Sequence, residues 1–296
     1  MAIASQVFVL FAVVLAGILS RKLNYFTDET IHGVSELVVN ITLPCLTVYN
    51  MQRPYSKDVL FNFFLTFFLS LLLISAALFL SYLLFAHSPR ERRGILSNLC
   101  AMSNCGFMGY PMIMVINPEY MIYAVSFNIA YSVIAWTVGI SLVSGETRVH
   151  LRQILLNPCL ISSLLGLLLF SLNIMLPDTL SDILETIGSL TTPLSMLLVG
   201  TRISGLKLSE FTHWEYPVVA VTRLLLFPAA SFFLLSLLPV SQDVIRTIFI
   251  LFAMPCGTLT SIQAELCGRD ASFAARNITL TTLLSLATIP LICQLL

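Results

Sequence analysis

The chain has 296 residues, of which 57% are hydrophobic and only 10% are charged, and its formal net charge is zero. A soluble globular protein carries about 25% charged residues, so this composition excludes a water-covered surface for most of the chain and indicates a membrane protein. The neutral balance offers no attraction for nucleic acid, which is not expected as a partner.

The seven cysteines include no C-x-x-C pair, so neither a zinc site nor a disulfide framework is predicted. They lie mostly in apolar segments, where we interpret them as small packing residues. No metal or other cofactor is expected. Arg21 and Lys22 follow the first apolar run instead of preceding it, so a cleaved signal peptide is not expected.

Apolar segments long enough to cross a bilayer recur along the whole chain. A membrane-spanning helix needs about 20 mostly apolar residues. Ten segments meet this requirement: residues 2–20, 33–51, 59–86, 94–115, 120–143, 153–173, 180–203, 214–238, 243–266 and 271–295. The second, fourth, seventh and ninth are less apolar, so we expect these four inside the bundle. The sequence predicts an all-α integral membrane protein with ten transmembrane helices.

Basic residues are distributed unevenly between the two sides of this predicted bundle. Loops on one side hold eleven: Arg21, Lys22, Arg90, Arg92, Arg93, Arg148, Arg152, Arg202, Lys207, Arg269 and Arg276. Loops on the other side hold three: Arg53, Lys57 and Arg246. The positive-inside rule places the first side in the cytoplasm. Both termini are then expected outside a cytoplasmic membrane.

Two sequence features recur at nearly one spacing. Pro44 in the second span has a counterpart, Pro193, 149 residues later in the seventh span. A Cys-Gly pair that begins at Cys105 in the fourth span recurs at Cys256 in the ninth, 151 residues later. The matches are short, so chance similarity remains an alternative to an internal repeat.

This spacing divides the chain into halves, 1–146 and 151–296, with five predicted spans each. An odd number of spans gives the second half the opposite topology, related to the first by a pseudo-twofold axis in the membrane plane. Inverted repeats of this kind are typical of secondary transporters.

The fourth and ninth spans contain helix breakers at matching places. The fourth has two glycines before Pro111, and the ninth has Pro255 followed by Gly257. Proline removes a backbone donor and glycine weakens a helix, so the two helices are expected to come apart at Pro111 and Pro255. Paired interruptions indicate a transporter site, and a helix N-terminus exposed there suits a carboxylate. Proline kinks that only aid packing are the alternative.

Arg223 is the one basic residue well inside a predicted span. Charged residues at membrane depth are costly and often functional, but this one lies near the predicted cytoplasmic end, where its stem could snorkel toward water. Structural and functional roles both remain open. The middle of the fourth, fifth and ninth spans holds no carboxylate, which disfavours a proton relay. Backbone carbonyls could still bind sodium.

Five segments along the chain resemble motifs of the auxin efflux carrier family, which includes plant PIN carriers and bacterial malonate and malate permeases. Residues 104–111, NCGFMGYP, resemble the family motif N-x-x-F/V-x-G-I/Y-P. The other segments are LPCLT at 43–47, LNPCLISSLLG at 156–166, RLLLFP at 223–228, and AMP at 253–255 followed by Ala264-Glu265. The similarity runs over nearly the whole chain.

The resemblance implies an inverted five-plus-five repeat, with a scaffold of spans 1, 2, 6 and 7 and a transport domain of spans 3–5 and 8–10. It implies that the two interrupted helices cross where a substrate carboxylate binds, and that a homodimer works by an elevator mechanism. The substrate-binding residues are then Thr47, Asn104, Pro111, Asn157, Pro255 and Gly257. The loop at about 144–152 is much shorter than the regulatory loop of plant members. The bacterial branch is therefore the better match, and auxin is not supported as the substrate.

The leading hypothesis is a secondary transporter of small organic anions, in particular carboxylates. A sodium-coupled organic-anion symporter resembling the bile-acid family is the first alternative, and a membrane sensor without transport is a more distant one. An enzyme is not expected, because the four histidines lie in or beside loops and no G-x-S-x-G motif occurs. The ATP-binding motif G-x-x-x-x-G-K-[ST] is also absent.

Overall fold

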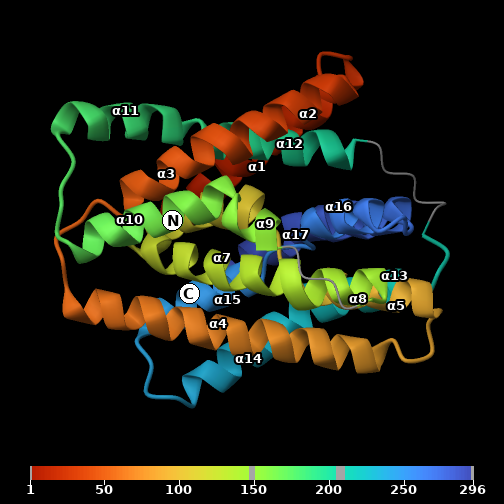
Figure 1. Cartoon of the computed structure of the whole chain (residues 1–296). Helices are drawn as coiled ribbons and strands as arrows, with labels where there is room; N and C mark the ends of the chain where they lie inside the picture. Colours follow the sequence, from red (N-terminus) through yellow and green to blue (C-terminus); the bar gives the residue numbers. More distant parts are fainter. Residues whose placement is uncertain (1, 147–150, 205–210, 295–296) are drawn as a thin grey trace. The chain divides into compact units, whose positions relative to one another are not determined.

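The computed structural model describes residues 2–146, 151–204 and 211–294. Within these ranges every regular element is a helix (Figure 1), and the β-type pairing found there is one isolated antiparallel bridge between Ser103 and Cys256. The prediction of an all-α chain is confirmed. Arg148 and Lys207, two of the residues behind the predicted orientation, lie outside the described residues.

The helices follow the apolar segments of the sequence. Their bounds are α1 (Ala2–Lys22), α2 (Asp28–Leu37), α3 (Leu43–Asn50), α4 (Lys57–Leu84), α5 (Arg90–Ala101), α6 (Tyr110–Ile116), α7 (Met121–Ile134), α8 (Ile140–Ser144), α9 (Leu151–Leu155), α10 (Pro158–Ser171), α11 (Asp178–Ser189), α12 (Thr191–Ile203), α13 (Glu215–Val221), α14 (Phe227–Ser236), α15 (Gln242–Phe252), α16 (Leu259–Leu266) and α17 (Ala271–Cys293). Wider π-helical turns join some of them, namely η1 (Val38–Thr42), η2 (Cys105–Gly109), η4 (Ala135–Gly139) and η6 (Thr222–Leu226), and η3 (Pro118–Tyr120) is a 3-10 turn.

Several of these helices join into stretches long enough to cross a membrane. Among the described residues six stretches qualify by length and composition: Asp28–Asn50, Lys57–Leu84, Pro118–Ser144, Asp178–Ile203, Glu215–Ser236 and Ala271–Ile292. Cys105–Ile116 and Pro158–Ser171 are shorter apolar helices. The chain is thus a multi-pass membrane protein, while the count of ten spans and their inverted arrangement stay predictions.

The predicted sixth span, 153–173, is divided in the structure. Helix α9 ends at Leu155, and α10 begins at Pro158 with Asn157 as its N-cap. Proline disfavours the helical conformation in the residue before it, yet it is well tolerated in the first helical turn. The Asn-Pro pair therefore ends one helix and starts the next.

Burial only partly follows the expectation drawn from polar content. The stretches Asp28–Asn50 and Asp178–Ile203 were expected inside the bundle, but only 33% and 39% of their apolar windows are buried, much as in Lys57–Leu84 at 33%. By contrast Pro118–Ser144, which is not among the four spans expected inside, is 72% buried. The polar side chains of Thr42, Thr47, Thr191 and Ser195 in these two spans are buried all the same. A span can therefore bury a few polar side chains while most of its apolar residues stay exposed.

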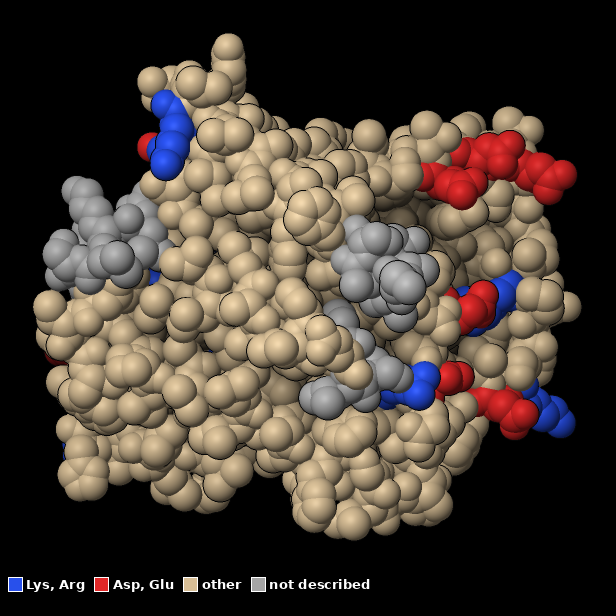
Figure 2. Space-filling model, turned by 180° about the vertical axis from the view of Figure 1, so that it is seen from behind, with Lys and Arg blue, Asp and Glu red and all other residues tan. Residues whose placement is uncertain are grey.

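The outward surface is largely apolar, as lipid contact requires. Along α4 the side chains of Phe61, Phe68, Leu72 and Phe79 are all exposed and lie on one side of the helix. The face drawn in Figure 2 is mostly free of Lys, Arg, Asp and Glu side chains. Apolar surface on this scale indicates a lipid environment.

The helices form two compact units. The first unit comprises Met1–Phe67, Gly106–Ile129 and Leu155–Gly205, and the second comprises Phe68–Cys105, Ala130–Ile154 and Leu206–Leu296. These units cut across the predicted repeats 1–146 and 151–296, which stay a prediction, as does the assignment of a scaffold and a transport domain.

In the first unit, small residues bring helix backbones into direct contact. A Cβ atom on Gly17 of α1 would lie 2.2 Å from the Leu197 carbonyl oxygen of α12, and one on Gly200 of α12 would lie 2.1 Å from the Val14 carbonyl oxygen. Only glycine permits such an approach, which is a common basis of helix association in membranes. The backbones of α1 and α12 are thus in contact at Gly17 and Gly200.

The first unit also contains a contact between two residues that the predicted repeat would make equivalent. The Thr191 hydroxyl donates to the Thr42 hydroxyl over 2.9 Å, and these residues are 149 positions apart. A contact between such residues is what a twofold axis would produce, and the repeat itself stays a prediction.

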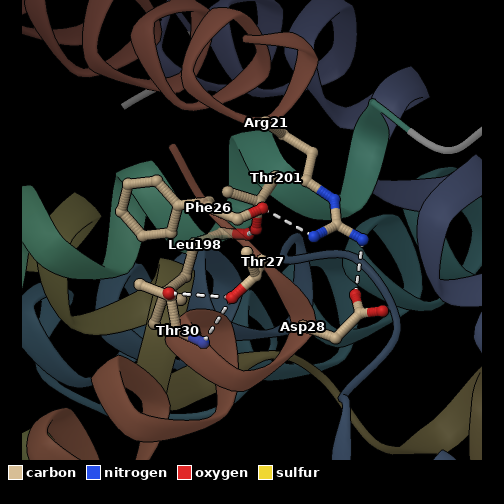
Figure 3. Close-up of polar contacts among 7 residues, drawn as sticks. All are labelled: Arg21, Phe26, Thr27, Asp28, Thr30, Leu198 and Thr201. Carbon is tan, nitrogen blue, oxygen red and sulfur yellow. Dashed lines mark hydrogen bonds and ion pairs between the residues drawn. The ribbon is translucent and has the colours of Figure 1, made fainter. Parts of the chain in front are cut away.

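Side chains hold the turn between α1 and α2 (Figure 3). Arg21 Nη1 donates to the Phe26 carbonyl oxygen over 2.6 Å, and the same guanidinium forms an ion pair with Asp28. Thr27 caps α2, because its hydroxyl oxygen accepts a hydrogen bond from the Thr30 amide at 3.2 Å. The Arg21 contacts and the Thr27 cap together join the end of α1 to the start of α2.

The glycine contact predicts a graded effect on stability. Gly200→Ala is expected to destabilise the protein by about 1–3 kcal/mol through overpacking, because the new methyl group meets backbone that cannot rotate away. Gly166→Ala should cost less, because its nearest neighbour is the Met51 side chain. Thermal unfolding of the purified protein in detergent measures both.

Gly33→Ala is the matched control, since a methyl group at this position would have no atom within 4 Å. Equal melting temperatures for Gly200→Ala and Gly33→Ala would show that α1 and α12 are not in backbone contact.

Candidate functional site

Two predicted membrane helices are interrupted, and both interrupted segments belong to the second unit. Helix α5 ends at Ala101, and the chain becomes helical again at Cys105; α15 ends at Phe252, and α16 begins at Leu259. The sequence predicted interruptions in these two spans, and both are present. The non-helical segments, 102–104 and 253–258, are where the candidate site is centred.

The two interrupted segments pair with each other through their backbones. The Asn104 amide donates to the Pro255 carbonyl oxygen over 2.8 Å, and the Gly257 amide donates to the Met102 carbonyl oxygen over 2.7 Å. Ser103 and Cys256 lie opposite each other in the antiparallel bridge between these bonds. We call this pairing the crossing. It supplies partners for backbone groups that the broken helices leave unused.

The crossing is closed to solvent. Ser103 and Asn104 are buried, with 1% and 5% of their surfaces exposed, and Cys256 is fully buried. The crossing is also tied to α17, because the Cys256 amide donates to the Thr281 hydroxyl oxygen at 3.3 Å. Three helical segments of the second unit therefore hold the crossing in place.

Gly257 is required by the close approach of the two segments. A Cβ atom there would lie 2.8 Å from the Tyr131 hydroxyl oxygen, 2.9 Å from the Ser103 carbonyl oxygen and 3.2 Å from the Met102 carbonyl oxygen. Real Cβ atoms do not approach backbone oxygens so closely. A side chain at position 257 would therefore force the two segments apart.

Arg223 connects the ends of both interrupted helices. Its Nη1 donates to the carbonyl oxygens of Cys100 and Ala101 at 2.9 and 3.0 Å. Its Nε donates to the Met254 carbonyl oxygen at 2.9 Å, and its Nη2 to that of Phe252 at 2.5 Å. The residue is fully buried, so its stem does not snorkel to water, which was one of the alternatives left open. The guanidinium lies instead at the C-terminal ends of α5 and α15.

A pair of buried amides braces the helices around the crossing. Asn98 of α5 donates through Nδ2 to the Gln263 Oε1 of α16 at 2.9 Å and to the Gly139 carbonyl oxygen at 3.1 Å. Gln263 Nε2 in turn donates to the Ala135 carbonyl oxygen at 2.6 Å. Both carbonyl acceptors lie in the π-turn η4, whose wider geometry leaves carbonyls for side chains. No short motif links residues 165 positions apart, so the sequence does not predict this network.

Pro111 is not at the break, which corrects the prediction. The fourth span comes apart at residues 102–104, and Pro111 lies buried in the first turn of α6. The π-turn η2 directly precedes that helix. Proline breaks an α-helix by losing a donor and by meeting the carbonyl four residues earlier, and a wider turn removes this conflict. Pro255, in contrast, does lie in the interrupted segment.

The same arrangement recurs at other prolines. Pro44 follows π-turn η1 and Pro228 follows π-turn η6, each two residues after the turn ends. In η1 the Leu43 amide bonds to the Val38 carbonyl, five residues earlier. Widened turns thus let proline continue a helix at these places.

Thr47, Pro111 and Asn157 belong to the first unit, whereas Asn104, Pro255 and Gly257 meet at the crossing in the second. The buried Thr47 hydroxyl donates to the Leu43 carbonyl oxygen of its own helix at 2.8 Å. Asn157 Oδ1 caps α10, accepting from the amides of Cys159 and Leu160 at 2.9 and 3.3 Å. The Thr47 and Asn157 side chains therefore each have a local structural partner.

Interrupted helices that pair inside a multi-pass helical protein are typical of the secondary membrane transporters. A family model described as "Membrane transport protein" matches residues 2–149 and again residues 146–293. The chain belongs to this family, the auxin efflux carriers. No match was found among the curated proteins. The family is one of membrane transporters, in agreement with the expectation that the protein is not an enzyme.

The geometry at Gly257 predicts that the crossing depends on this residue. Gly257→Ala is expected to separate the segments, because its methyl group meets backbone oxygens on one side and the Tyr131 hydroxyl on the other. Two buried backbone hydrogen bonds would be strained, and leaving such groups unpaired costs about 1–3 kcal/mol each. A lowered melting temperature in detergent measures the effect.

Gly106→Ala serves as the control, because its Cβ would meet only the Leu43 Cδ1 atom at an ordinary 3.8 Å. If both variants melted at the wild-type temperature, the tight approach at Gly257 would be refuted.

Proposed function

We propose that the protein is a secondary transporter of small organic anions, in particular carboxylates, and that the anion binds at the crossing. The charge balance of the crossing is the observation that carries this proposal. The two interrupted helices present two C-terminal ends and two N-terminal ends. Among the described residues, the charged side chain of Arg223 donates hydrogen bonds to carbonyls at both C-terminal ends.

The C-terminal ends carry partial negative charge, equivalent to about half an elementary charge each. The Arg223 guanidinium offsets this charge through bonds to the carbonyls of α5 and α15. The crossing is then left with the partial positive charge of the N-terminal ends. An anion is the ligand that this arrangement favours.

The N-terminal ends follow the interrupted segments directly. Helix α16 begins at Leu259, and the turn η2 that leads into α6 begins at Cys105. The first amides of a helix have no acceptor within the helix, and a carboxylate can accept from them. Asn104 lies one residue before η2, and its carboxamide is the side-chain group that we assign to the anion.

The remaining predicted site residues enter this proposal with narrower roles. Because Asn157 Oδ1 is used as a helix cap, its amide nitrogen is the group that could serve a substrate. Thr47 uses its proton within its helix, so its oxygen could only accept. Pro111 and Pro255 shape the backbone and offer no side-chain donor.

We further propose an elevator-type alternating-access mechanism, in a homodimer, with both termini outside the cytoplasmic membrane. The short segment at about 144–152 supports similarity to the bacterial malonate and malate permeases over the plant PIN carriers. Alternating access requires that the site keep its shape while its exposure changes, and the backbone pairing at the crossing supports such rigidity.

Uptake into proteoliposomes tests the proposal. Mono- and dicarboxylates are supplied one at a time, and sodium and proton gradients are varied independently. Saturable uptake of a carboxylate supports a transporter. Uptake that requires sodium would favour the alternative of a sodium-coupled symporter, and binding without flux would favour a sensor.

Asn104→Ala is expected to reduce carboxylate uptake at least tenfold without loss of folded protein. A hydrogen bond to a charged group contributes about 1.5–3 kcal/mol, which corresponds to roughly 10- to 100-fold in binding. The substitution keeps the backbone hydrogen bond from the Asn104 amide to the Pro255 carbonyl oxygen. Uptake rates and melting temperature are measured together.

Asn50→Ala is the matched control, since its side chain donates to the Leu46 carbonyl of its own helix. Wild-type uptake by Asn104→Ala would remove this residue from the site.

A further inference from the structure

The oxygen atoms around Arg223 form a ligand set that a metal cation could also use. Four backbone carbonyl oxygens converge on it, from Cys100, Ala101, Phe252 and Met254. In transporters built on interrupted helices, unwound carbonyls and helix C-terminal ends are the groups that coordinate sodium. Here a side chain of the protein occupies that environment.

We infer that the Arg223 guanidinium is a built-in counter-cation for the crossing and takes the place of an exchangeable sodium ion there. Arginine remains protonated in proteins at all ordinary pH values, so the charge is permanent. The inference concerns the stability and ion selectivity of the crossing, and it holds whatever the transported solute is.

The geometry fits a positioning role that other side chains could not fill. Three nitrogens of the planar guanidinium reach carbonyls on two separate helix ends, whereas a lysine ammonium is a single point of charge. Its carbon also lies 5.5 Å from the centre of the Phe252 ring, which adds a cation–π contact. Arg223 thereby sets the distance between the ends of α5 and α15.

Burying this charge requires its hydrogen bonds to be complete. A buried cation without partners is strongly unfavourable, and carbonyls gathered without a cation would repel one another. The arginine and the four carbonyls therefore depend on each other. Removing the arginine creates a vacancy whose lining favours a small cation.

Melting temperatures in different salts test this inference without any substrate. The wild type, Arg223→Ala and Arg223→Lys are purified in detergent and compared in sodium chloride and choline chloride at equal ionic strength, with and without guanidinium at tens of millimolar. Arg269→Gln is the matched control, because that guanidinium donates to a single carbonyl, that of Ser144, at 2.7 Å.

The wild type and Arg269→Gln are each expected to melt at the same temperature in sodium as in choline. Arg223→Ala should lose on the order of 10 °C in choline and recover part of this loss with sodium or guanidinium. Arg223→Lys retains a cation, so it should lose less and show no response to sodium.

Sodium-dependent stabilisation of the wild type would overturn the inference, even if Arg223→Ala failed to fold. A folded Arg223→Ala protein that responds to neither cation would overturn it as well. The melting experiment contains no carboxylate, so its result does not depend on whether the protein transports carboxylates. A sodium response in the melting experiment would likewise leave the proposal of carboxylate transport untouched.

Discussion

The structure depends on satisfying backbone polar groups at the place where two membrane helices are broken. In hydrocarbon each unpaired amide or carbonyl costs several kcal/mol, so an interrupted helix persists only where other groups replace its lost bonds. The pairing of Asn104 with Pro255 and of Gly257 with Met102 replaces some of them. The Arg223 guanidinium replaces others at the two helix ends. Neither helix could be interrupted alone, because each break supplies the partners of the other.

This mutual dependence explains why small and polar residues gather there. Gly257 is needed because the segments approach too closely for a side chain. Asn98 and Gln263 brace α5 against α16 through the carbonyls of a π-turn. The network joins α5, whose last carbonyls also accept from Arg223, to α16, the second half of the other interrupted helix. A rigid crossing is what a site needs if it is to keep its shape while its exposure changes.

The sequence was informative wherever a local rule decides the structure. Proline and glycine clusters predicted both interrupted helices, and apolar length predicted the helical segments. The break in the fourth span was misplaced at Pro111, because proline also occurs just after a widened π-turn, and that turn leaves no clear sequence signal. Pro158 could have been read as a helix start, because Asn157 directly before it is a favourable N-cap residue. The predicted site at Asn157 came from resemblance instead.

Local sequence rules do not predict contacts between segments that are far apart in the chain. The partners of Arg223 lie up to 123 residues away and are all backbone carbonyls, which carry no residue-specific signature. The sequence could therefore only leave structural and functional roles open for this residue. The choice was decided by where the ends of α5 and α15 lie, and that follows from packing of the whole second unit.

The predicted repeat gives a reason why one arginine serves two helices. At a spacing of 149–151 residues, the first-half counterparts of Arg223 are Leu72, Leu73 and Ile74, and none of them is charged. Asn104 and Pro255, which are bonded to each other, are themselves 151 residues apart, so a twofold axis would pass through the crossing. At such an axis the C-terminal ends of both interrupted helices come together. A single cation beside the axis can then reach both ends, whereas a second, equivalent cation would be repelled by the first.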